Sequence, residues 1–234
     1  MSSTLDATFL PADRPLPRGW LVPVGLGRWL LLGTAVLQAV TLALISFGGS
    51  DQDPPVVPAG YTFSIWSVII AGCLAAALVG FARRRAASAA YRAVHLRLSV
   101  VQLLFVAWLL AATSSVVWLT VPIFAAMLAL TLAGLRRLLS TGDVRAPDEM
   151  TGRGRSGADR LALGLLGGTL GIYAGWSTAG VWINMASLLA QSGISPAGAT
   201  GAAWQSAFLL GACVVAVGAM RALAAPLAYV AAVA

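Results

Sequence analysis

Apolar runs of about 20 residues recur along this chain of 234 residues, separated by short polar segments. A helix of about that length crosses roughly 30 Å of hydrocarbon. A membrane β-barrel would instead show segments of about ten residues that alternate between apolar and polar side chains. The runs 68–80 and 119–134 are apolar on all sides. The sequence therefore predicts an all-α fold, a polytopic bundle of transmembrane helices.

Seven candidate spans follow from these runs: 29–47, 61–81, 98–112, 116–135, 161–189, 203–220 and 222–234. The last is short for a span and contains Pro226, so a short interfacial helix is the alternative. We expect a polar tail over 1–27, a five-helix core over 28–190 and a membrane extension over 191–234. The longest polar connection, about 140–160, is expected to be a mobile loop.

The distribution of charge indicates the orientation. Only 10% of the residues are charged, against about a quarter in a soluble domain. All 15 basic residues are Arg, and they alternate along the chain with loops that carry none. Because cytoplasmic loops attract Arg, we expect a cytoplasmic N-terminus and no nucleic-acid partner. All-Arg basicity and Ala richness favour a bacterium, hence an integral protein of its cytoplasmic membrane.

The sequence offers little for catalysis or metal binding. No charged residue lies at the centre of a predicted span, which argues against an ion-coupled pump. Cys73 and Cys213 fall inside apolar runs without metal-ligand spacing, and His95 stands alone between Arg92 and Arg97 in a predicted cytoplasmic loop. No hydrolase, kinase or dinucleotide signature is present. We therefore expect no catalytic residues, no metal site, no cofactor and no enzymatic activity.

Aromatic and amide side chains are the remaining candidates. Among eight Trp residues, Trp66 lies near the outer end of the second span. Trp176 and Trp182 are six residues apart in the fifth span and fall on different faces, so both cannot line one narrow cavity. The amides Gln102 and Asn184 have two interpretations, an interhelical hydrogen bond or the lining of a ligand cavity.

Two segments together carry a family resemblance. The first is 58–66, PAGYTFSIW, and the second places Tyr173, Trp176, Gly180 and Asn184 at fixed helical spacing. These segments resemble the tryptophan-rich sensory protein family, also called the translocator protein family. The sequence departs from the family pattern at Ile70, where the family has Tyr, and at Val106, where it has Asn.

The resemblance implies a five-helix translocator-like core, with about two additional C-terminal helices in this chain. It further implies a pocket under the first external loop for porphyrins or other flat hydrophobic molecules, including sterols, and a possible homodimer. In that pocket the aromatic residues would stack on the ligand and the amides would orient it, while the loop 48–60 would act as a lid. The implied lining residues are Pro58, Phe63, Trp66, Gln102, Trp108, Tyr173, Trp176 and Asn184.

Several functions remain open at this point. The first is a membrane-embedded sensor or receptor for a tetrapyrrole-like ligand. The second is a transporter of a hydrophobic metabolite, and the third is a structural membrane subunit in which the Trp residues serve packing. An enzyme acting on the bound ligand is the fourth, although no general acid–base pair supports turnover.

Overall fold

The computed structural model describes residues 23–45, 54–140 and 157–223, with the backbone alone for 157–160. These residues form helices and short connections, and no strand occurs among them. The α-helices are α1 (Val24–Leu44), α2 (Ile65–Gly80), α3 (Arg83–Ala86), α4 (Ala89–Ala112), α5 (Thr120–Ser140), α6 (Gly157–Gln191) and α7 (Gly198–Leu223). Two 3₁₀ turns, η2 (Gly60–Ser64) and η3 (Val117–Leu119), lead into α2 and α5.

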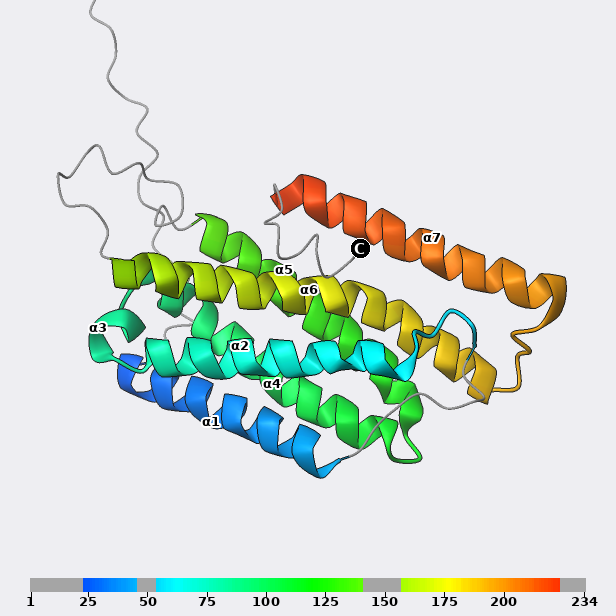
Figure 1. Cartoon of the computed structure of the whole chain (residues 1–234), viewed down its shortest axis with the longest axis horizontal. Coiled ribbons are helices and arrows are strands. Elements are labelled where there is room, and N and C mark those ends of the chain that lie inside the picture. The colour runs from blue at the N-terminus through cyan, green and yellow to red at the C-terminus, as the bar shows by residue number, and fades with distance from the viewer. Residues whose placement is uncertain (1–22, 46–53, 141–156, 224–234) are drawn as a thin grey trace, which may run out of the picture.

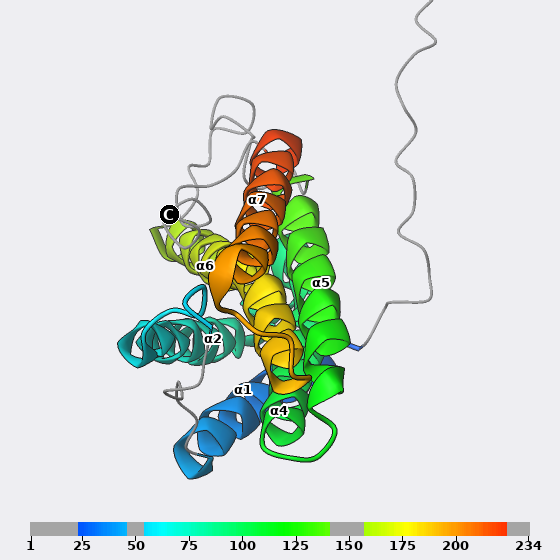
Figure 2. The same ribbon diagram turned by 90° about the vertical axis from the view of Figure 1, so that its right-hand side faces the viewer.

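Five helices close into a ring. Helix α1 packs against α2 and α4, α2 packs against α6, and α5 joins α6 to α4. Helix α7 lies outside this ring, along α6 and part of α5 (Figures 1 and 2). The prediction of an all-α helical membrane bundle is confirmed.

Length and composition fit a membrane location. In the described part of the chain, five segments are long and apolar enough to span a bilayer: Val24–Leu44, Gly60–Gly80, Ala89–Ala112, Val117–Ser140 and Gly198–Leu223. Helix α6 has 35 residues and no charged residue from 161 to 191. The side chains on the outside of the ring are largely apolar, which suits contact with the hydrocarbon of a lipid bilayer.

Successive long helices run in opposite directions, which gathers the arginines at one end of the bundle. Arg28 lies near the start of α1, the run 83–85 follows α2, and Arg137 lies in the last turn of α5. We call this the arginine end, at the left of Figure 1, and the opposite end the loop end. The loop end carries the connection into η2 and the turn between α6 and α7.

One predicted helix start was wrong. The third span was expected from 98, but α4 begins at Ala89, so Arg92, His95 and Arg97 lie on a helix and not in a loop. Ser88 caps this helix by accepting a hydrogen bond from the backbone N–H of Tyr91. The charged residues led to the late predicted start, but charge does not interrupt the backbone of a helix.

The other boundaries differ by a few residues. Helix α1 begins at Val24, five residues before the predicted start, and α5 continues to Ser140 because its two arginines lie within its last turns. Most of the predicted seventh span, 222–234, lies outside the described residues, as do 1–22 and 46–53.

Glycines allow the helices of the ring to approach closely. A Cβ added at Gly80 would overlap the ring of Tyr91, and one added at Gly180 would overlap the ring of Phe124. Between membrane helices, small residues allow such close packing, because apolar surface alone gives no driving force in lipid. Gly80 therefore leaves room for the Tyr91 ring against α2, and Gly180 fixes the approach of α6 to α5.

Candidate functional site

An aromatic cluster fills the ring of helices in its loop-end half. Trp66 is at its centre, with only 1% of its side chain exposed. Its ring centroid lies 4.6 Å from Phe105, 5.6 Å from Trp108 and 5.7 Å from Tyr173. The remaining members are Phe124 at 6.1 Å and Trp176 at 6.3 Å. Most of these pairs meet at tilted or edge-to-face angles, the geometry that aromatic pairs prefer.

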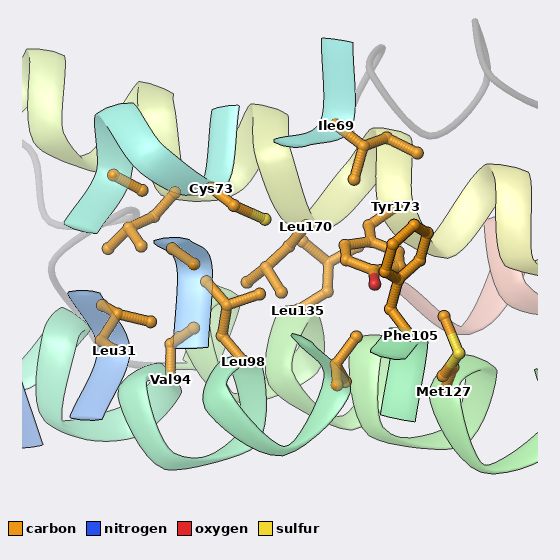
Figure 3. Packing of buried hydrophobic residues seen from close by; sticks show 14 of the residues in the cluster. Leu31, Ile69, Cys73, Val94, Leu98, Phe105, Met127, Leu135, Leu170 and Tyr173 are labelled. Atoms are coloured by element: carbon orange, nitrogen blue, oxygen red, sulfur yellow. The ribbon is translucent and has the colours of Figure 1, made fainter. Parts of the chain in front are cut away.

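Helical spacing brings these rings together. Phe105 and Trp108 are three residues apart on α4, and Tyr173 and Trp176 have the same spacing on α6, so each pair shares a face. Trp66 enters from the first turn of α2. Aliphatic side chains fill the ring toward the arginine end; Figure 3 shows Leu31, Val94, Leu98, Leu135 and Leu170 of this region, with Phe105 and Tyr173.

The two amides predicted to line a pocket both make interhelical hydrogen bonds. Asn184 Oδ1 accepts a hydrogen bond of 2.9 Å from Trp108 Nε1. Its Nδ2 donates to the carbonyl of Gly180, at 2.8 Å. On the other side of the ring, Gln102 Oε1 accepts from the Thr34 hydroxyl. These bonds fit the structural interpretation of the amides, and Asn184 also fixes the indole plane of Trp108.

The segment that precedes α2 covers the cluster at the loop end. Phe63, in η2, packs edge-to-face on Trp176, with 5.9 Å between ring centroids. Pro58 is half-buried in the preceding segment. The backbone N–H of Val56 donates to Gln205 Oε1 of α7, at 3.1 Å. The outer helix therefore holds this loop in place over the aromatic cluster.

Trp66 carries an unusual feature for a buried indole. Its Nε1 atom is buried and has no hydrogen-bond partner among the described residues. A buried Trp N–H usually finds an acceptor, since an unpaired donor costs about 1–3 kcal/mol. The cluster thus holds an unpaired donor at its centre.

Six of the predicted site residues contact one another in this region: Phe63, Trp66, Trp108, Tyr173, Trp176 and Asn184. Gln102 is bonded to Thr34 of α1, and Pro58 lies in the segment before η2. Trp182 is separated from the six, as its face predicts. The ring of Trp182 packs on Phe208 of α7, with centroids 5.8 Å apart, instead of entering the cluster. Phe105 and Phe124 belong to the cluster but were not among the predicted site residues. Phe105 could have been predicted from its spacing, since it lies three residues before Trp108 and three after Gln102 on one face of α4.

Comparison with known proteins identifies the family. The family model described as TSPO-like protein matches residues 34–233. The chain belongs to the TSPO-like family. Neither the curated proteins nor the solved structures give a significant match.

Membership agrees with the resemblance read from the two sequence motifs, and together with the apolar helices it makes the chain an integral membrane protein of the TSPO type. The match to TSPO-like proteins extends beyond the motifs. We expected a resemblance over 28–190, whereas the match continues through α7. Helix α7 therefore belongs to the part of the chain that the family shares.

We expect Gln205→Leu to loosen the loop over the cluster. Gln205 is 8% exposed, and its Nε2 donates to the carbonyls of Pro196 and Gly201 while Oε1 binds Val56. The change removes all three hydrogen bonds and leaves the Val56 N–H and the Pro196 carbonyl without this partner, at a cost of about 1–3 kcal/mol. Hydrogen exchange followed by mass spectrometry should show faster exchange around Val56.

The matched control is Gln191→Leu, because Gln191 is exposed at the end of α6. It should leave exchange in the loop unchanged. Equal exchange in the Gln205→Leu protein and the unaltered protein would show that Gln205 does not hold the loop.

Proposed function

We propose that this TSPO-like protein is a membrane-embedded sensor or receptor that binds a flat hydrophobic ligand, in the first instance a tetrapyrrole, in the aromatic cluster. The protein binds this ligand without chemical turnover. Trp66, Trp108 and Trp176 stack on the flat face of the ligand. The loop that leads into η2 closes over it.

The unpaired Nε1 of Trp66 is the observation that carries the proposal. A donor in the middle of an apolar bundle has no water to satisfy it, and an acceptor on the ligand removes this cost. The surrounding rings offer flat, polarizable faces, as binding sites for flat apolar molecules do.

The tight packing of the cluster favours a second function, that of a structural membrane subunit. Trp66 and Tyr173 are almost wholly buried, and edge-to-face rings stabilise a helix bundle without any ligand. Transport of a hydrophobic metabolite is a third possibility for the same cluster. Binding separates the first two functions, and movement of bound ligand across proteoliposomes separates a transporter from a sensor.

The test is a titration of the purified protein in detergent with protoporphyrin IX. Tryptophan quenching and the porphyrin absorption band report binding. Trp66→Phe and Trp176→Phe keep an aromatic ring in the core but remove the indole. We expect saturable binding to the unaltered protein and about tenfold weaker binding to each variant, because both lose stacking area and Trp66→Phe also loses the unpaired Nε1 donor.

Trp182→Phe is the matched control, since Trp182 is on the same helix as Trp176 but packs on α7. It should bind the porphyrin like the unaltered protein. No saturable binding, or equal loss in all three variants, would contradict the proposed site. It would favour the structural role.

A further inference from the structure

Two glutamines lie in the ring of helices, next to the aromatic cluster. Gln38 on α1 and Gln102 on α4 are both fully buried, and neither is in the first or last turn of its helix. A side-chain amide has four hydrogen-bonding positions, and in lipid these must find partners within the protein or on a ligand. These two amides are only partly satisfied.

Each amide is bonded at one polar atom alone. Gln38 Nε2 donates to the hydroxyl oxygen of Tyr173, at 3.2 Å, and Gln102 Oε1 accepts from Thr34. Gln38 Oε1 and Gln102 Nε2 have no hydrogen-bond partner in the described part of the chain. The Cys73 thiol, a weak acceptor, lies beside Gln102. Rotating either amide by 180° exchanges its two atoms and still leaves one of them unpaired.

The two unpaired atoms belong to one set of neighbouring polar side chains, which we call the polar group: Thr34, Gln38, Gln102 and Tyr173. Thr34 and Gln38 are one turn apart on the same face of α1, and Thr34 binds Gln102 across the ring. Gln38 binds Tyr173, whose ring contacts Trp66 in the aromatic cluster. Through Tyr173 this polar group adjoins the aromatic cluster.

The positions of the nearest arginines argue against a ligand that places an ionised carboxylate at these amides. Arg28, the nearest charged residue along α1, is ten residues from Gln38, about 15 Å along the helix axis. The guanidinium of Arg97 on α4 donates to the carbonyl of Ala93, toward the arginine end. Among the described residues neither amide is hydrogen-bonded to an Arg, so an ionised carboxylate bound there would have no paired cation, which is costly in lipid.

We propose that Gln38 and Gln102 form a polar subsite for an uncharged group that both donates and accepts hydrogen bonds, such as a carboxamide or a hydroxyl. This inference rests on the proposed function and names its ligand class, a flat apolar molecule with a neutral polar edge. A carboxamide satisfies the unpaired donor of one amide and the unpaired acceptor of the other. An ester can only accept, and an ionised acid lacks both a donor and a counter-charge.

Three porphyrins with the same macrocycle test the subsite: protoporphyrin IX, its dimethyl ester and its diamide. We expect the diamide to bind the unaltered protein about tenfold more tightly than the diacid, with the ester in between. Gln38→Met and Gln102→Met replace the amide by an apolar chain of similar length. Each should bring the affinities for diamide and diacid to within about twofold of one another.

Gln205→Met is the matched control, because Gln205 is also buried but binds backbone groups at the loop end. It should keep the preference for the diamide even if all affinities change. The absence of binding for every porphyrin would overturn the proposed function. Saturable binding without a diamide preference, or a preference that survives both methionine substitutions, would overturn the subsite alone. Where a methionine variant does not fold, the order of the three porphyrin affinities in the unaltered protein tests the subsite.

Discussion

Trp66→Ala should be the most destabilising single substitution in this protein, by about 3–5 kcal/mol. The indole is at the centre of the aromatic cluster, with 1% exposure and five aromatic neighbours from α4, α5 and α6. Its removal leaves a cavity that rigid rings on three helices cannot fill by small movements. The free energy of unfolding, measured by titration with a denaturing detergent in mixed micelles, checks this expectation.

Trp118→Ala is the matched control. Trp118 is 57% exposed in η3 on the outside of the bundle, so its truncation opens no cavity. We expect a change of about 0.5 kcal/mol or less, as for most surface substitutions. Similar losses for the two substitutions would mean that Trp66 does not support the packing of the ring.

Because Trp66→Ala is expected to destabilise the fold, it is a poor test of ligand binding. A cavity at the centre of the cluster weakens the fold and the ligand site together, so loss of binding in this variant says little about stacking. Trp66→Phe retains much of the ring volume and removes the Nε1 donor, the atom without a partner. The smaller substitution is therefore the one that tests binding.

The general architecture could be predicted from the sequence because the bilayer imposes it. Apolar runs of about 20 residues fix the helices, since every backbone polar group must be satisfied within its own segment. The motif at 58–66 and the spacing from Tyr173 to Asn184 indicated the family, which the match over 34–233 confirms. The helix ends were less predictable, because α4 includes Arg92 and Arg97, which the charge pattern had placed in a loop.

The details of the site depend on contacts between helices, which periodicity does not encode. Spacing along α6 separates Trp176 from Trp182, and the structure confirms this separation. No local pattern, however, shows that Phe124 of α5 meets Trp108 of α4, or that Gln38 reaches Tyr173. These pairs depend on the order of helices in the ring. Whether the predicted lining residues bind a ligand stays a prediction.

Two glycines of α6 should respond in opposite directions to the same substitution. A Cβ added at Gly180 overlaps the ring of Phe124, which is 1% exposed and packed against Trp66 and Trp108. Because the ring has no free space to move into, Gly180→Ala forces α5 and α6 apart. We expect a loss of about 1–3 kcal/mol in the free energy of unfolding, the usual cost of overpacking.

A Cβ added at Gly168 has no atom within 4 Å, so Gly168→Ala meets no steric cost. Alanine favours the helix over glycine by up to about 1 kcal/mol, and we expect a gain in stability of that order. Mixed-micelle unfolding of the two variants measures both values. Since Phe124 belongs to the aromatic cluster, Gly180→Ala should also weaken porphyrin binding, whereas Gly168→Ala should not. A neutral Gly180→Ala would mean that α5 and α6 are not held at the close approach on which the cluster depends.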